Sequence, residues 1–340
     1  MIKYNLLFTL DYEIHGNGDG NPYALMVEPT YRLMSLLESY GQHLTIMADV
    51  AEILCFKRYW EETGKDDFHV ADIEQQLCDA VRRGHDVQLH IHSSYFNAVW
   101  VGRHFDQCVE EYNMATLPYQ RIETMVSQCV DYLENLICKI KPNYKVWLFR
   151  AANWSMMPTP NLYAVLVKCG ITHDTSVYKG GCQGGNVCYD YRNAYDNLLS
   201  YPASSSDINN YDKTGKLIEM PIYTELQPFW HFISLIRIYR MIRSKFHKHK
   251  KIGNDLQNQT INTEDNRKLS FKSFFRLSPW KLDFNQATGK QLIAAIKRIK
   301  QRKIADREVV NIVLIGHSKS FIPHNEKTLK SFLRWYAKQD

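Results

Sequence analysis

The sequence lacks the features that would assign the chain to a membrane, secreted or disulfide-rich class. It has no run of about 18 apolar residues, so we expect no membrane-spanning helix. The segment after Met1 passes directly into an apolar run without a small-residue cleavage site, so we expect no cleavable signal. Eight cysteines are scattered along the chain without a Cys-x-x-Cys motif. This pattern favours reduced thiols and a cytoplasmic protein.

The composition is that of an ordinary globular protein. The 340 residues, 45% of them hydrophobic, supply enough apolar material for one large α/β domain or two smaller ones. We predict one domain over residues 1–340, and no internal repeat is visible. Cys182 and Cys188 flank a glycine-rich loop and could pair, although two free thiols are the favoured alternative.

Apolar strand-like runs alternate with helix-like segments, an order that favours parallel strands over a β-sandwich. Strands are expected at residues 6–11, 43–48, 87–92, 146–150, 171–174, 217–221 and 309–316. Helices are expected at 31–40, 73–83, 119–139, 161–169 and 288–302. Gly41 and Gly84 end two of these helices, and Pro118 begins a third. An α/β fold with about seven parallel strands is therefore predicted.

Two stretches interrupt this alternation and are expected to be insertions. Residues 180–212 are rich in Gly, Asn, Tyr and Ser, and we expect them to form a loop over the site. Residues 228–268 combine a basic amphipathic segment with a polar stretch, 254–267, that lacks periodicity and is expected to be mobile.

The most informative polar residues are Asp11 and Glu13 in one strand-like run and His90 and His92 in another. Side chains two positions apart on a β-strand share a face, so each pair converges from one strand end. Two carboxylates and two imidazoles at neighbouring strand ends could hold a divalent metal ion with one coordination position open, which indicates an enzyme. The competing interpretation is a chance His-x-His pair capped by neighbouring polar groups, because such short patterns recur by chance.

Polar residues recur at the carboxyl ends of the expected strands, where barrel enzymes place their chemistry. They are Asp11, His90, His92, Arg150, Asp174 and His317. Structural alternatives exist for three of them. Arg150 could be an ion-pair partner, Asp174 a helix or turn cap, and His317 a satisfied histidine at a strand end. We interpret His85 as structural, and His15 as a loop residue or an additional ligand.

Six short motifs follow one another along the chain. They are Thr9-Leu10-Asp11-Tyr12-Glu13, Leu44-Thr45-Ile46-Met47, Gly84-His85-Asp86-Val87-Gln88-Leu89-His90, Phe149-Arg150-Ala151-Ala152-Asn153-Trp154, His173-Asp174-Thr175-Ser176-Val177 and Leu314-Ile315-Gly316-His317. Together they resemble the polysaccharide deacetylase family, the NodB-homology domain of carbohydrate esterase family four. The resemblance spans nearly the whole chain, from residue 6 to about 335. Each motif is weak alone, but six in the family's order are specific.

The resemblance implies a distorted (β/α) barrel that uses a divalent metal ion to hydrolyse an N-acetyl or O-acetyl group of a sugar or glycan precursor. It implies that Asp11 is the base acting on water, that Arg150 orients Asp11, and that His317 protonates the leaving amine. Asp174 would hold the His317 imidazole or support Arg150. The residues expected to contact the substrate are Trp154 and Asn153.

Two positions depart from the family's pattern. Tyr12 stands where many members have a second aspartate, so Glu13 is predicted to take its place as a metal ligand. Ser94 stands where the usual second histidine lies, and His92 is the predicted substitute. The predicted metal set is Glu13, His90 and His92, with Zn²⁺ favoured and Co²⁺, Ni²⁺ or Mn²⁺ as alternatives. Asp11 could bind the metal directly if Glu13 points away.

Two other functions are compatible with the sequence. The altered ligand positions motivate a catalytically weak barrel that binds glycan or organises a glycan-assembly complex. A different metal-dependent hydrolase of C–N bonds is less favoured, because its His-x-His would normally lie on the first strand. Here His90 comes after two βα units.

The net charge of +6 is unevenly distributed. Residues 237–251 contain seven Lys or Arg residues and no acid, and an apolar, aromatic stretch precedes them. This order is typical of a basic amphipathic helix on an anionic membrane surface. The alternative, which we favour slightly, is a helix packed on the protein body with a solvated basic end. Nucleic-acid binding is not expected, because the basic character is local and no nucleic-acid motif accompanies it.

Vesicle co-sedimentation separates the two interpretations of residues 229–251. On a membrane, binding should require anionic lipid and fade in high salt, since each cation near such a surface contributes about 1 kcal/mol. Replacing Arg240, Arg243, Lys245 and Lys248 by Gln should reduce it. Equal sedimentation with and without anionic lipid would refute the membrane role and leave the packed helix.

Overall fold

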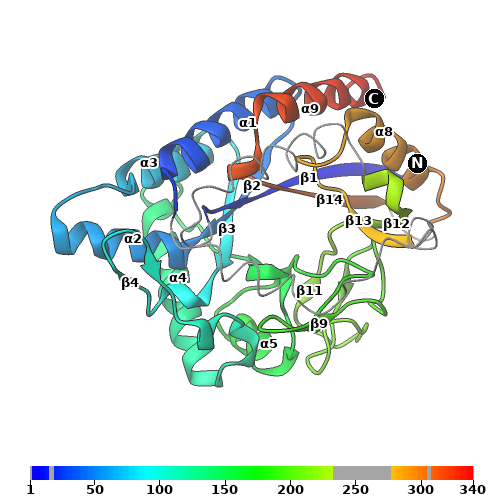
Figure 1. Cartoon of the computed structure of the whole chain (residues 1–340). Coiled ribbons are helices and arrows are strands. Elements are labelled where there is room, and N and C mark those ends of the chain that lie inside the picture. Colours follow the sequence, from blue (N-terminus) through cyan, green and yellow to red (C-terminus); the bar gives the residue numbers. More distant parts are fainter. Residues whose placement is uncertain (1, 15–18, 233–276, 305–307, 340) are drawn as a thin grey trace, which may run out of the picture.

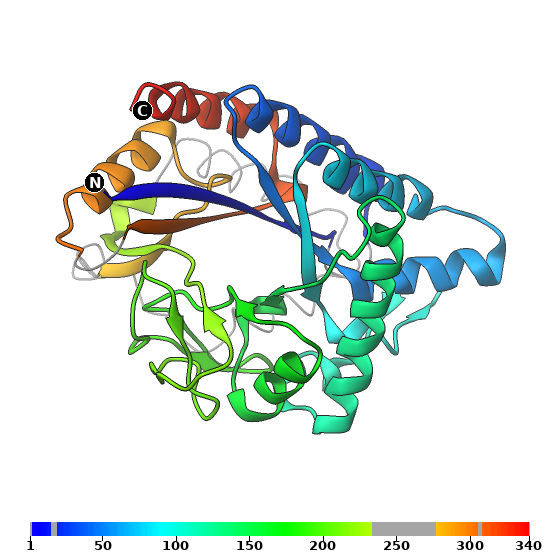
Figure 2. The same cartoon turned by 180° about the vertical axis from the view of Figure 1, so that it is seen from behind.

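The structure, a computed structural model, describes residues 2–14, 19–232, 277–304 and 308–339. Its centre is a curled eight-stranded sheet in the order β10-β11-β7-β6-β3-β2-β1-β14. Helices lie around the outside of the curl (Figure 1), and Figure 2 shows the same arrangement from behind. The fold is a distorted (β/α) barrel, which confirms the fold class expected from the sequence.

Seven strands of the main sheet pair in parallel, and β10 pairs antiparallel with β11 at one edge. The strands are β1 (Lys3–Tyr12), β2 (Leu44–Asp49), β3 (Asp86–Ile91), β6 (Leu148–Ala151), β7 (His173–Asp174), β10 (Tyr201–Pro202), β11 (Ile218–Glu219) and β14 (Val309–His317). Strands β7 and β11 are shorter than expected, because each pairs over only two residues. Ile222, just after β11, bridges in parallel to Val313 of β14 and so links the two sides of the curl.

All the expected helices are present, with ends shifted by a few residues. The long helices are α1 (Glu28–Glu38), α2 (Val50–Thr63), α3 (Val70–Arg82), α4 (Tyr119–Cys138), α5 (Thr159–Lys168), α8 (Gly289–Lys300) and α9 (Pro323–Tyr336). Helices α2 and α9 were not expected from the sequence. A signal for α2 exists, because Asp49 is its N-cap and accepts a hydrogen bond from the Glu52 amide at 3.4 Å. An Asp followed three residues later by Glu, just before an apolar run, marks a helix start.

The two insertions carry small sheets of their own. The segment 180–212 contains the pair β8 (Cys182–Gln183) and β9 (Tyr189–Asp190), and it packs beside β6 through a 2.6 Å hydrogen bond from Tyr191 Oη to the Trp154 carbonyl. Strands β12 (Thr224–Pro228) and β13 (Leu277–Lys281) form a hairpin that carries residues 229–276. The predicted basic segment 237–251 and the predicted mobile stretch 254–267 lie outside the described residues.

The structure bears on the predicted state of the cysteines and on the predicted lack of a membrane-spanning helix. All eight cysteines are among the described residues and are free thiols, Cys182 and Cys188 included. Within the described residues, no helix combines the length and the apolar character needed to cross a bilayer. A third two-stranded sheet, formed by β4 (Val99–Trp100) and β5 (Phe105–Asp106), follows β3 in the chain.

A glycine is required at the carboxyl end of β14. Strands β1 and β14 form the longest parallel pair in the sheet, and their register sets Asp11 opposite His317. The ring of Phe284 lies directly on Gly316, so a Cβ atom built there would collide with the ring and approach Asn285 Oδ1 at 2.5 Å. This close approach packs the chain after β13 against the strand end.

Gly316→Ala is therefore expected to lower the free energy of unfolding by about 1–3 kcal/mol, the usual range for overpacking a buried position. Urea unfolding of the variant and the wild type measures the change. Gly184→Ala is the matched control, since nothing lies within 4 Å of a Cβ built at Gly184. An equal effect of both substitutions would contradict the packing argument.

Candidate metal centre and active site

The parallel register brings polar residues from five strands together in a row along the carboxyl edge of the barrel. Asp11 on β1 lies opposite His317 on β14. His90 on β3 lies opposite Arg150 on β6 and, on its other side, opposite Asp49 at the end of β2. Because neighbouring parallel strands end at the same edge, side chains far apart in the sequence meet there.

The three residues predicted to bind metal lie together. The donor atoms of Glu13, His90 and His92 are within 4.8 Å of one another, and all three side chains are buried. Nε2 of His92 is 2.7 Å from Glu13 Oε2, and Nε2 of His90 is 3.3 Å from the same oxygen. Two imidazoles and one carboxylate are a ligand set that leaves a fourth coordination position for water or substrate.

A metal ion fits this cluster. Glu13 Oε2 is buried and, among the described residues, accepts no hydrogen bond of good geometry, although both Nε2 atoms are close to it. The Nδ1 atom of His90 is 2.9 Å from the Arg150 carbonyl oxygen. A carbonyl only accepts, so this contact fixes a proton on Nδ1 and turns Nε2, the nitrogen available as a ligand, toward Glu13. The donor atoms therefore converge as they would around a cation.

Charges around the cluster keep its carboxylate ionised. Burial alone would raise the pKa of Glu13, but the Lys319 ammonium, 2.9 Å from Oε1, and His92 hold that pKa well below its usual value. Burial would likewise lower the pKa of His90, but the contact with Glu13 and the charge of Asp11 raise it to about 9. A metal ion at His90 Nε2 therefore has to displace a proton.

Asp11 lies beside the cluster and is paired with a fully buried arginine. Arg150 Nη1 donates to Asp11 Oδ1 at 2.6 Å, Nη2 donates to Thr9 Oγ1 at 2.8 Å, and Nε donates to the Thr175 carbonyl at 3.0 Å. Nε2 of His317 is 3.5 Å from the other oxygen, Asp11 Oδ2. Burial would raise the pKa of Asp11, but Arg150 and then His317 outweigh it and lower the pKa. Asp11 is thus an ionised carboxylate near neutral pH.

The structure places Asp174 away from His317. Both oxygens of Asp174 accept hydrogen bonds from Ser176, and burial raises the pKa of Asp174, an effect that Arg150 opposes from longer range. Besides Asp11, the carboxylate that interacts electrostatically with His317 is that of Asp283, whose pKa burial raises against the lowering effect of His317. Among the described residues, Asp174 therefore belongs to the surroundings of Arg150 rather than to the imidazole.

Asn153 and Trp154 follow β6 in a short 3₁₀ turn, and both have left-handed backbones with φ of 51° and 60°. Side chains other than glycine rarely adopt this conformation, and such strained residues cluster at functional sites. The ring of Trp154 meets the His317 ring edge-on, with centroids 6.2 Å apart. Asn153 Nδ2 is buried and has no hydrogen-bond partner among the described residues. Trp154 thus borders the row of polar side chains, and Asn153 precedes it in the same turn.

Several residues at this end of the barrel were not expected from the sequence. They are Asp49, Glu52, Lys281, Asp283 and Lys319. Glu52 accepts a hydrogen bond from the Ile14 amide at 2.9 Å, and burial raises its pKa to about 8. Lys319 had a signal, because it follows the closing Leu-x-x-His motif by two residues. Lys281 and Asp283 had none, because they lie outside the six motifs and no periodic pattern marks their position.

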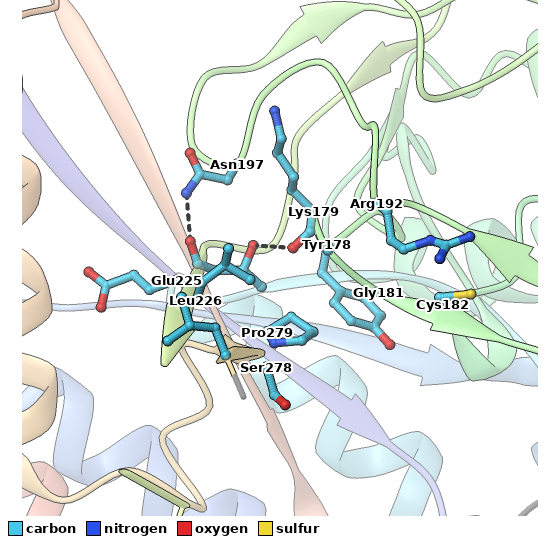
Figure 3. A pocket seen from close by; sticks show the side chains of 13 residues that line it. Tyr178, Lys179, Gly181, Cys182, Arg192, Asn197, Glu225, Leu226, Ser278 and Pro279 are labelled. Atoms are coloured by element: carbon cyan, nitrogen blue, oxygen red, sulfur yellow. Dashed lines mark hydrogen bonds between the residues drawn. The ribbon is translucent and has the colours of Figure 1, made fainter. Parts of the chain in front are cut away.

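A cavity of about 840 Å³ adjoins this end without including the metal cluster (Figure 3). It lies between the loop 178–182 and the β12–β13 hairpin, which are joined by a 3.0 Å hydrogen bond from Thr224 Oγ1 to the Lys179 carbonyl. Tyr178 and Pro279 line its wall. The Tyr178 ring is also in contact with Lys281, whose Nζ is 4.4 Å from the ring centroid. The cavity and the polar row therefore share a border at Tyr178.

Comparison with known proteins identifies the fold. No protein-family model and no curated protein sequence matches this chain. The chain is similar to a solved structure from Mycobacterium smegmatis described as a polysaccharide deacetylase, with a TM-score of 0.50 and 13% identity over 100% of this chain and 85% of that chain. The chain has the polysaccharide deacetylase fold. This fold is the one that the sequence motifs implied.

Two other solved structures are similar. One is 4-α-glucanotransferase from Thermococcus litoralis, with a TM-score of 0.49 and 12% identity over 100% of this chain and 38% of that chain. The other, from Parabacteroides distasonis, is described as a glycoside hydrolase/deacetylase and has a TM-score of 0.49 and 9% identity over 99% of this chain and 66% of that chain. At such low identity the likeness concerns the fold alone, and the site residues have to carry any argument about activity.

His90→Ala and His92→Ala are each expected to abolish stoichiometric metal binding, since losing one of three protein ligands weakens a site sharply. Elemental analysis after incubation with Zn²⁺ and gel filtration measures the metal content. His324→Ala, at an exposed position on α9, is the matched control and should keep the wild-type content. Full occupancy in both His90 and His92 variants would exclude this cluster as the metal site.

Proposed function

We propose that this protein is a metal-dependent hydrolase that removes an acetyl group from an acetylated sugar or from a glycan or glycolipid precursor. One observation carries the proposal. The Glu13, His90 and His92 cluster lies beside a second, separate carboxylate, Asp11, whose own cation and imidazole partners hold it ionised. A metal site next to an independent base is the combination that hydrolysis of an acyl group needs.

The residues of the site divide the proton transfers between them. A divalent ion held by Glu13 and the two histidines supplies Lewis acidity toward an acyl oxygen. Asp11, ionised and oriented by Arg150, takes a proton from the attacking water. His317, with Nε2 only 3.5 Å from Asp11, gives a proton to the departing amine or alcohol. Trp154 forms an apolar wall beside His317 that shields the acyl carbon from bulk water.

We propose Zn²⁺ as the metal, with Co²⁺, Ni²⁺ or Mn²⁺ as substitutes. Two imidazoles and one carboxylate are a common ligand set of catalytic zinc, while Mg²⁺ and Ca²⁺ prefer sites built from oxygen alone. Lys319 donates to Oε1 of Glu13, so Oε2 is the oxygen that would be available to a metal ion.

We infer a cytoplasmic position from the scattered cysteines, all of which are free thiols. A substrate attached to a lipid carrier would suit contact of residues 229–251 with an anionic membrane face, as the order of apolar and basic residues in that segment suggests. Nucleic acid is not a proposed partner, because no nucleic-acid motif accompanies the basic residues.

A catalytically weak, glycan-binding barrel is the second candidate, and the two departures from the family's pattern favour it. Tyr12 Oη donates to Gln76 at 2.7 Å and Ser94 Oγ donates to Gln107 at 2.7 Å. Neither side chain is among the ligands of the Glu13 cluster. Measurable acetate release would exclude this candidate. Release of another product from a C–N bond would instead support a different metal-dependent hydrolase.

Asp11→Asn is expected to lower acetate release from acetylated amino sugars by on the order of 10²–10⁴-fold, the usual contribution of a general base. The amide keeps the shape of the carboxylate but cannot take up the proton. Metal content and melting temperature, measured on the same sample, should show a folded, metal-loaded protein. Asp106→Asn, at an exposed position on β5, is the control. Loss of metal together with activity would reassign Asp11 as a ligand.

A further inference from the structure

Lys281, the last residue of β13, places its ammonium against two aromatic rings at the edge of the site. Its Nζ is 3.1 Å from the centroid of the Trp154 ring and 4.4 Å from that of Tyr178. A cation is attracted to the face of an aromatic ring by the ring's electron density. The Trp154 ring also contacts the ring of His317, at 6.2 Å between centroids. The ammonium is therefore one aromatic ring away from the proposed proton donor.

The two rings are held in place by contacts of their own. Tyr178 packs on Gly181, where a Cβ atom would collide with the ring, and its Oη is 2.7 Å from Tyr189 Oη. Trp154 has a left-handed backbone whose carbonyl accepts a 2.6 Å hydrogen bond from Tyr191 Oη. The two aromatic rings that contact the ammonium are thus held in position by the fold.

Within the described part of the chain, this ammonium has no counter-ion, unlike two other cations at this end of the barrel. Arg150 and Lys319 each pair with a carboxylate at less than 3 Å. Among the described residues, Lys281 Nζ forms no ion pair and no hydrogen bond, and Asp283 acts on it only from longer range. A cation supported by rings alone keeps its hydrogen-bond donors available.

Lys281 lies largely within the protein. The residue keeps part of its surface exposed, yet burial lowers the pKa of its ammonium to about 8, against the raising effect of Asp283 and Asp11. The residue is thus largely enclosed by protein without being completely buried. Electrostatic attraction is stronger in such a place than at an open surface, because less water screens it.

We propose that Lys281 binds an anionic group of the substrate, so that the acetylated sugar carries a phosphate or a carboxylate near the reacting acetyl group. The sugar itself rests on the proposed function, whereas the anion site rests on the geometry of Lys281, Trp154 and Tyr178. The cavity of about 840 Å³ on the other side of Tyr178 gives space for the next part of a longer substrate (Figure 3).

Isothermal titration calorimetry with matched ligands tests this proposal. The neutral ligand is N-acetylglucosamine, the phosphate ligands are its 1- and 6-phosphates, and the carboxylate ligand is N-acetylglucosaminuronic acid. Inorganic phosphate and acetate are the free-anion arms. We expect at least one anionic sugar to bind about tenfold or more tightly than the neutral sugar, the gain from one charge-assisted hydrogen bond. The arm that shows the gain identifies phosphate or carboxylate.

Lys281→Met should remove this preference while leaving the affinity for the neutral sugar unchanged, and Lys281→Arg should retain a large part of it. The matched control is Lys297→Met, which removes another ammonium near an aromatic ring, that of Trp335 at 5.8 Å on the α8–α9 face. Because phosphate could also meet a bound metal ion, only the difference between these two Met variants is attributed to Lys281.

Three results would overturn the proposal. The first is equal affinity for neutral and anionic sugars. The second is an equal loss of both in Lys281→Met, which would mean that Lys281 only supports the rings. The third is the same Lys281-dependent affinity for inorganic phosphate or acetate as for the sugars. Acetate release is measured separately, so a protein that binds anionic sugars through Lys281 without turnover contradicts only the proposed function. Turnover of neutral sugars alone contradicts only this inference.

Discussion

Arg150 has no exposed surface, and its guanidinium extends from β6 to Asp11 on β1, two strands that are separated in the sheet by β3 and β2. A buried guanidinium is tolerated only when its donors are paired, and Arg150 satisfies this with Asp11, Thr9 and Thr175. The contact therefore holds the curl of the sheet together from the inside. It also sets the orientation of Asp11, while the Arg150 carbonyl orients His90. Loss of this one residue would disturb the base, the metal cluster and the barrel together.

The buried acids at this end fall into two groups with opposite behaviour. Asp11 and Glu13 each lie against a cation, which lowers the pKa despite burial. In Glu52, Asp174 and Glu219 the desolvation dominates and raises the pKa. Asp11 and Glu13 are therefore carboxylates that act as anions, whereas the other three are carboxylates that can hold a proton. Burying so many acids is possible because only the first group has to stay charged near neutral pH.

The sequence predicted the parts of the structure that depend on local pattern and on strand direction. Asp11, His90, Arg150 and His317 follow apolar runs, and parallel strands end at one edge, so their meeting could be foreseen. Residues that reach the site from outside the main sheet could not be predicted in this way. Asp283 and Lys281 reach the site from a hairpin whose strands are separated by residues 229–276, and no periodic pattern marks their position. The position of Asp174 could not be predicted either, because two-residue strands such as β7 leave side-chain direction undetermined by pattern. Asp11 and Asp283, rather than Asp174, are the carboxylates that act on His317 among the described residues.

The β12–β13 hairpin joins the two chain ends on either side of residues 229–276. Pro228 and Leu277 are paired across the hairpin, so the chain leaves the barrel and returns to it at one point. The entropy of closing a loop grows only slowly with its length, so the pairing of these two ends depends little on how many residues lie between them. The hairpin is therefore a place at which the length and the surface residues of the chain can change while Lys281 and the strand ends keep their positions.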